Sequence, residues 1–342
     1  MLKVPLSVLA LAGLSLVSAS RAVTITEDFS TNPLQQGWQV FGDTNLFGWN
    51  QTNQNLEVTW DSTHPNSYFY RPLNVTLTRY DDFTLEFDLR LSDIASGVEP
   101  GKTGPLQIGF GLLNLEGATS TNFMRGAYGG APNVAEFDYY TDGYYVDSGV
   151  VYPSPASTVP SFIPGTDPHH YAPVFVSVFE TELPTGQTVH IRMAYSGGDQ
   201  TAVVSTTTNG GPLSQLGPLV LTDSGNSQFI PTDTFRVDTL SISSYSSAGD
   251  PFDSVLAHGI VDNLTVTAKL LPITRLTGSS TTNGVWAAQF FAHSNWLYTL
   301  ERTSDFKSWM PVSATLRGTE AILTLQDTNA PPAQAFYRIR TD

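Results

Sequence analysis

Apolar and polar residues alternate along much of the chain, a period of two that predicts β-strands. Residues 83–91 show it most clearly, because every odd-numbered position is apolar and every even-numbered position is polar. One face of that strand is therefore expected in a core and the other in water. The same pattern predicts strands at residues 56–60, 107–113, 235–245 and 260–268, and a hairpin over residues 187–208.

No long stretch has the period of an amphipathic helix, so the predicted fold class is all-β. Residues 23–269 are expected to form a larger domain of two packed antiparallel sheets. Residues 270–273 form a predicted linker, and residues 274–342 a second, smaller β-sandwich. Strands are expected there at residues 285–292, 296–303, 310–315, 321–326 and 335–340.

Residues 1–22 have the pattern of a signal peptide. Lys3 precedes an apolar run over residues 4–17, and the small residues Ser18, Ala19, Ser20 and Ala22 follow. The run is short for a membrane span, so we expect cleavage, with an uncleaved anchor as the alternative. The mature protein is then secreted or resides in the cell envelope (periplasm or outer surface in a bacterium). No later segment is apolar enough to span a bilayer.

Charge and cysteine content narrow the range of partners. The formal net charge is −15 and the pI about 4.6, so phosphate backbones are repelled and no nucleic-acid partner is expected. Cationic metals and neutral polymers such as glycans remain compatible with this charge. The absence of cysteine excludes disulfides, thiolate metal sites and thiol nucleophiles. Oligomeric state is left open.

The candidate chemistry lies in residues 133–142, which start as a strand. Glu136 and Asp138 are two positions apart, so both carboxylates point to the same face. Like charges held this close are unfavourable unless a cation, a proton or a substrate uses them. Asp142 and Asp147 follow in a segment rich in Gly and Tyr. Residues 150–173 are dense in Pro and Ser and are expected to form a long loop containing His169 and His170.

Three segments together resemble the concanavalin A-like jelly roll of legume lectins, laminin-G-like domains and β-glucanases. They are the strand Glu136-Phe137-Asp138, the hairpin strand over residues 189–195, and the closing strand that contains Val261-Asp262-Asn263-Leu264. The resemblance covers roughly residues 23–269. It implies a concanavalin A-like jelly-roll sandwich for this part of the chain, and it indicates the fold more strongly than the ligand.

The resemblance to legume lectins implies a metal site on the acidic strand. Their motif Glu-x-Asp-x-Tyr-x-Asn, followed by an Asp and a His, binds calcium and manganese. The matching positions here are Glu136, Asp138, Tyr140, Asp142 and Asp147. Oxygen ligands of this kind suit calcium. The position of the His is occupied by Tyr152, so a single calcium ion is the expectation.

The resemblance to β-glucanases implies a hydrolase as the alternative. Their strand carries two catalytic glutamates around an Asp, and here only Glu136 and Asp138 match. The third position falls on Tyr140 or Thr141, neither of which can act as the carboxylic acid that retaining chemistry needs. A degenerate or divergent glycoside hydrolase would need a carboxylate from another strand. The sequence therefore assigns no catalytic residue outside that alternative.

Simpler interpretations stay open at this stage. Glu136 and Asp138 are also compatible with a solvated sheet face, or with hydrogen bonds to nearby Arg or backbone groups. Tyrosine rings can stack on sugars, although aromatic residues of a sandwich more often belong to its core. Because side chains alternate, only part of the tyrosine set that includes Tyr139 is expected to be exposed. The candidate ligand-binding residues are Tyr140, Tyr144, Tyr145 and Tyr152.

The C-terminal segment resembles a small β-module of exported proteins from planctomycete- and verrucomicrobium-type bacteria. Residues 296–309 and the ending over residues 327–340 carry this resemblance. It implies a fibronectin- or immunoglobulin-like sandwich that acts as a spacer or stabilising partner.

The leading hypothesis is a non-catalytic, lectin-like protein that binds an extracellular or envelope polysaccharide, with calcium fixing the Tyr-rich loop. A third hypothesis is a structural protein of the envelope or matrix, whose jelly roll binds another protein. This alternative predicts a broad exposed apolar patch.

The calcium hypothesis predicts a stability gain that depends on Asp138. At roughly 100-fold excess over its Kd, a ligand of the folded state adds about 2.7 kcal/mol to the free energy of unfolding. Thermal unfolding of the mature protein with calcium or with chelator measures this gain. Asp138→Ala is expected to abolish it, and equal melting temperatures of the unsubstituted protein in the two buffers would exclude the site.

Overall fold

The computed structural model describes residues 21–121, 123, 133–140, 143–147, 150–154, 157–163, 179–180, 183–197, 201–220, 235–270, 276–282, 284–293, 296–331 and 335–341. For residues 143–147, 150–154, 157–163, 179–180, 213–220 and 277–282 the description is limited to the backbone.

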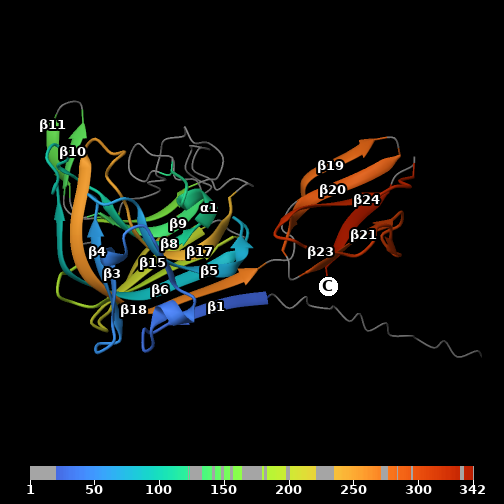
Figure 1. The fold of residues 1–342 in the computed structure, drawn as a ribbon. Coiled ribbons are helices and arrows are strands. Elements are labelled where there is room, and N and C mark those ends of the chain that lie inside the picture. The colour runs from blue at the N-terminus through green and yellow to red at the C-terminus, as the bar shows by residue number, and fades with distance from the viewer. Residues whose placement is uncertain are drawn as a thin grey trace, which may run out of the picture.

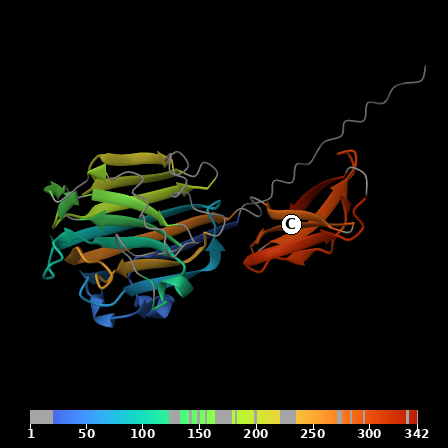
Figure 2. The ribbon, with the colours of Figure 1, turned by 90° about the horizontal axis from the view of Figure 1, so that it is seen from above.

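Two sheets, antiparallel except for the short parallel pairing of β7 with β18, make up the larger part of the chain (Figures 1 and 2). One sheet has the order β16 (Leu213–Val220), β15 (Thr201–Thr208), β14 (Val189–Ser196), β6 (Asp82–Ser96), β18 (Asp253–Leu270), β4 (Asn55–Asp61) and β3 (Phe47–Asn50), with β1 (Arg21–Glu27) and β7 (Gly104–Pro105) also paired to β18. The other has the order β13 (Phe179–Glu180), β12 (Ser157–Ile163), β9 (Val134–Tyr140), β8 (Gln107–Leu113), β17 (Val237–Ser244), β5 (Ser67–Leu77) and β2 (Gln39–Phe41).

Smaller elements complete the architecture. They are the hairpin of β10 (Gly143–Asp147) and β11 (Val150–Ser154), and the short helices η1 (Pro33–Gln36), η2 (Thr44–Leu46) and α1 (Leu115–Ala118). The C-terminal sheets are β19 (Leu276–Thr282), β20 (Val285–Ala292) and β24 (Ala321–Asp327), and β22 (Met310–Pro311), β21 (Leu297–Thr303), β23 (Leu316–Arg317) and β25 (Phe336–Thr341).

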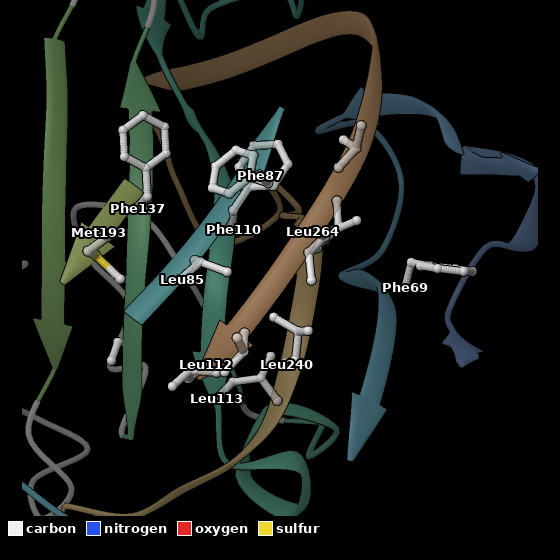
Figure 3. Packing of buried hydrophobic residues seen from close by; sticks show 14 of the residues in the cluster. Phe69, Leu85, Phe87, Phe110, Leu112, Leu113, Phe137, Met193, Leu240 and Leu264 are labelled. Carbon is white, nitrogen blue, oxygen red and sulfur yellow. The ribbon is translucent and has the colours of Figure 1, made fainter. Parts of the chain in front are cut away.

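The core of the larger sandwich lies between its two sheets. The odd-numbered side chains of β6 from Phe83 to Leu91 are at most 3% exposed, as the alternation predicts. Phe87 stacks on Phe110 of β8, with ring centroids 4.4 Å apart, and meets Phe137 of β9 edge-on at 5.9 Å (Figure 3). These rings join the sheets and determine which side of each strand faces inward.

The chain crosses repeatedly between the two sheets. It leaves the seven-stranded sheet at the end of β5 and enters the nine-stranded sheet with β6, and it crosses again from β17 to β18. In their sheets, β17 lies between β5 and β8, while β18 lies between β4 and β6. The predicted all-β jelly-roll sandwich is confirmed. A separate apolar cluster, containing Phe290, Tyr298 and Leu300, lies among the C-terminal strands.

The loop predicted over residues 150–173 is wrong at its start. Residues 150–154 form β11 and residues 157–163 form β12, which pairs with β9. Proline in this segment suggested a loop because it lacks an N–H donor. Among the described residues, however, β13 pairs with β12 only at Ser157 and Thr158, so Pro160 lies in an edge strand, where proline is tolerated.

The C-terminal strands agree with four of the five predicted segments. The exception is the segment over residues 310–315, where only Met310–Pro311 is strand, and β19 was not predicted.

No helix in the described part of the chain is long and apolar enough to cross a membrane.

Removing a ring from the inter-sheet core is expected to destabilise the protein strongly. Phe110→Ala should lower the free energy of unfolding by about 3–5 kcal/mol, because it leaves a cavity against Phe87. Phe252, which is 56% exposed, is the matched control, and Phe252→Ala should change stability by less than about 0.5 kcal/mol. Chemical denaturation measures both; equal effects of the two substitutions would contradict the assignment of the core.

Candidate functional site

Glu136 and Asp138 lie on the face of β9 that points away from the inter-sheet core. Phe137, between them, packs against Phe87, so alternation turns both carboxylates to the other side of the sheet. The prediction that they share a face is confirmed. They are nevertheless 1% and 0% exposed, so the interpretation as a solvated face is wrong. Their burial shows that other groups cover this face of the sheet.

Glycines on the neighbouring strand make room for the Glu136 side chain. In the register of β8 and β9, Gly111 lies opposite Glu136 and Gly109 opposite Asp138. A Cβ atom on Gly111 would lie 2.3 Å from the Glu136 Cβ, and one on Gly109 would lie 3.1 Å from its Oε2. The carboxylate can therefore extend over β8.

Tyr245, just after β17, reaches the same place from the opposite side. Its hydroxyl donates to Glu136 Oε2 over 2.7 Å, and its ring would lie 2.9 Å from a Cβ on Gly109. One hydrogen-bond partner of Glu136 is thus a buried tyrosine, which the sequence did not suggest.

The polar character of the face continues across β8 and β17. Ser241 and Ser243 lie opposite Gly111 and Gly109, are at most 1% exposed, and their hydroxyls are 2.8 Å apart. Carboxylates thus flank the glycines on one side and hydroxyls on the other. Gln107 lies on the same face, two residues before Gly109 and opposite Tyr140. The sheet carries a continuous stripe of oxygen-rich groups away from its apolar side.

Gln107 is the unusual member of this stripe. Its side chain is 1% exposed, yet neither its Oε1 nor its Nε2 has a hydrogen-bond partner in the structure described here. Leaving a buried polar group unsatisfied costs about 1–3 kcal/mol, so such an amide indicates a place for a ligand, ion or ordered water. An amide presents both a donor and an acceptor, as a hydroxyl group does.

The predicted tyrosines divide between different environments. Tyr139 is 2% exposed on the core side of β9, and its hydroxyl accepts from the Leu183 N–H at 3.2 Å. Tyr140 is partly buried at the end of the strand, on the face of the stripe. In the hairpin of β10 and β11, Tyr145 pairs with Tyr152, so these two positions share a face, while Tyr144 pairs with Pro153.

The acidic positions beyond β9 are only partly described. Asp147 ends β10, but only its backbone is described, whereas Asp142, His169 and His170 lie outside the described residues. In the described part of the chain, no group of three or more His, Cys, Asp or Glu side chains is arranged to hold a metal. The described donors near β9 are two carboxylates and the Gln107 amide oxygen, all of the hard oxygen type that calcium accepts.

Sequence reasoning missed Tyr245, Gln107 and the two glycines. The alternation in residues 107–113 puts Ile108, Phe110 and Leu112 on one side of the strand. It left Gln107, Gly109 and Gly111 on the other side, where two glycines in one strand indicate a close approach of neighbouring atoms. Nothing in the sequence near Tyr245 connects it to Glu136, 109 residues earlier.

Comparison with known proteins gives structural neighbours only. No family model matches the chain, and no curated protein matches its sequence. Among solved structures, a peanut lectin with a nonamer peptide has 16% identity and a TM-score of 0.41, over 71% of this chain and 98% of that one. Lectin II from Ulex europaeus has 12% identity and a TM-score of 0.43, over 73% and 99%. A basic winged bean lectin with Tn-antigen has 10% identity and a TM-score of 0.42, over 73% of this chain and 99% of that one.

The glycine positions under Glu136 can be tested by adding one methyl group. Gly111→Ala is expected to lower the free energy of unfolding by about 1–3 kcal/mol or more, because the new Cβ collides with β9. Gly48→Ala is the matched control in β3, where the nearest atom to an added Cβ is 3.9 Å away. That substitution should be neutral or slightly stabilising. Urea unfolding compares the two, and a neutral Gly111→Ala would contradict the close approach.

Proposed function

We propose that the larger sandwich binds a neutral glycan without catalysis, at the end of the polar stripe where the partly exposed Tyr140 lies opposite Gln107. The observation that carries the proposal is the buried amide of Gln107, which lacks hydrogen-bond partners within the described structure. A sugar hydroxyl donates and accepts at once, and so can satisfy both of its atoms. Tyr140 lies directly opposite Gln107 and supplies an aromatic neighbour at the end of the stripe.

The acidic charge of the protein supports an uncharged polymer as the ligand. At a net charge of −15, anionic polymers are repelled, whereas a neutral hydroxyl-rich chain is not. Carboxylate and amide groups are suitable acceptors for hydroxyl donors. Positions 145 and 152, on one face of the hairpin that follows β9, are the further candidates for stacking on sugar rings.

Calcium is part of the proposal as an organising ion. Glu136 and Asp138 would supply its first carboxylate ligands, with Tyr140, Asp142 and Asp147 as the further ligands that the resemblance implies. When bound, the ion would neutralise the acidic strand and fix the segment that leads into β10. Because Asp138 is buried, the isosteric Asp138→Asn is the variant that removes its charge with little change in packing.

A glycoside hydrolase is the alternative function. It requires a general acid in addition to Glu136 and Asp138, and the third position of the motif falls on Tyr140 or Thr141, neither of which is a carboxylic acid. The missing carboxylate would have to come from another strand. Release of reducing ends from β-glucans by the intact protein, abolished in Glu136→Gln, would favour the hydrolase over the binding protein.

Gln107→Leu is expected to separate binding from folding. The loss of two hydrogen bonds to the ligand should weaken glycan affinity about tenfold or more. Stability should stay equal or rise, because a buried polar group without partners is removed. A glycan array with calcium present identifies the ligand, and calorimetry then measures the affinity of each variant.

Gln289→Leu is the control, since Gln289 is an exposed glutamine on β20. This variant should keep both the affinity and the stability of the unsubstituted protein. Glycan affinity unchanged in Gln107→Leu, or no glycan bound by the unsubstituted protein, would overturn the proposal.

A further inference from the structure

The C-terminal sheets contact the larger sandwich through a buried histidine. His293 directly follows β20, and Glu320 directly precedes β24; these two strands pair through Ala292 and Ala321, so both residues lie at one end of that sheet. They meet the turn between β5 and β6, which contains Asp81. The two sets of sheets adjoin one another beyond the end of β18 (Figure 1).

Both ring nitrogens of His293 face carboxylates. Nδ1 is 3.2 Å from Glu320 Oε2, and Nε2 is 3.4 Å from Asp81 Oδ2, across the junction. The His293 side chain is 4% exposed and that of Asp81 0%. A neutral imidazole has one N–H, so it would turn a lone pair toward one of the two carboxylates. The geometry therefore requires the doubly protonated, cationic ring.

The two carboxylates are themselves held in place. Asp81 Oδ2 accepts from the backbone N–H and the hydroxyl of Thr78, both at 2.8 Å. Glu320 Oε2 also accepts from the backbone N–H of Thr76 in β5 at 3.3 Å, a second contact across the junction. The hydroxyl of Tyr298 accepts from the backbone N–H of His293 at 3.0 Å. These hydrogen bonds hold the two carboxylates and the backbone of His293 in place independently of the charge on the imidazole ring.

Charged and aromatic groups from both sets of sheets surround His293. The turn that holds Asp81 also contains Arg79, and Asp82 follows it as the first residue of β6. In the C-terminal sheets, the Phe291 ring meets His293 edge-on at 5.2 Å. The Arg236 guanidinium of the larger sandwich lies 4.2 Å from the Phe291 centroid. Burial raises the pKa of Tyr298 beyond the range in which tyrosine normally titrates. His293 is therefore the group at this junction that changes charge in mildly alkaline solution.

We propose that the imidazolium of His293 is a latch that docks the C-terminal sheets on the larger sandwich, and that loss of its proton releases them. Without that proton, Asp81 and Glu320 face each other across a neutral ring, and water must enter to solvate them. While His293 is charged, the C-terminal sheets are thus held rigidly on the larger sandwich. When His293 is neutral, only the connecting chain holds the two parts together.

The pH range over which docking is lost follows from the direction in which the pKa of His293 is shifted. Burial alone would lower the pKa of His293, but the bonds to Asp81 and Glu320 outweigh it and raise the pKa from 6.5 to about 9. A raised histidine pKa contributes stability that is complete below the ordinary value and is lost as pH rises through the folded value. Docking should therefore hold at neutral pH and fail above about pH 9.

The test uses the full chain, with small-angle scattering to follow docking and NMR to follow the His293 ring. The unsubstituted protein should gain in radius of gyration between about pH 7 and about pH 10.5, with a midpoint that matches the ring titration. His293→Gln should show an undocked profile at both pH values. Asp81→Asn keeps the shape of the turn and should lower the midpoint by about 1 pH unit or more, because one of the two opposing charges is removed.

His258→Gln is the matched control. His258 Nδ1 is 2.8 Å from Asp93 Oδ1, an equally close pair, but its side chains are 47% and 64% exposed and lie within the larger sandwich. This variant should keep the alkaline transition unchanged. A scattering profile of the unsubstituted protein that is constant over the pH range would overturn the latch. So would a transition that persists unshifted in His293→Gln or, if that variant does not fold, in Asp81→Asn.

Discussion

The packing of Phe87 against Phe110 and Phe137 is the contact on which the rest of the larger sandwich depends. It joins the two sheets at their centre and thereby sets the orientation of β8 and β9. Since side chains alternate along a strand, Glu136 and Asp138 must point to the opposite face when Phe137 points inward. The polar stripe is thus a consequence of the apolar core. A shift of β9 by one residue would turn its apolar side chains outward and its carboxylates into the core.

The fold could be predicted to a large extent because its signal is local. Alternation over residues 83–91 and 107–113 is a property of neighbouring positions, and it is strong enough to determine strand and inward face. The strands β11 and β12 escaped prediction because the effect of proline depends on which side of the strand has a neighbour. That is a property of the sheet, which sequence alone does not contain.

Only the part of the site that lies on a single strand could be predicted from the sequence. Glu136 and Asp138 were found from their spacing, whereas the contacts that define their environment come from β8 and from the end of β17. Tyr245 and Gln107 join the acidic strand by sheet pairing over long sequence separations. The same holds at the module junction, where Asp81 and His293 are brought together by the way the two sets of sheets meet. Burial of charged groups was likewise invisible, because an alternating strand predicts one face in water.

Pro160 has a consequence for how molecules of this protein behave next to one another. Along the described residues, β12 is an outer strand of its sheet beyond its two-residue pairing with β13. An open strand is a template on which a second molecule can add its own strand, and repetition of that step builds fibres. Proline offers no N–H at the middle of this template, so a foreign strand cannot form a continuous ladder there. Pro160 therefore protects the described part of this edge against strand addition by a second copy of the chain.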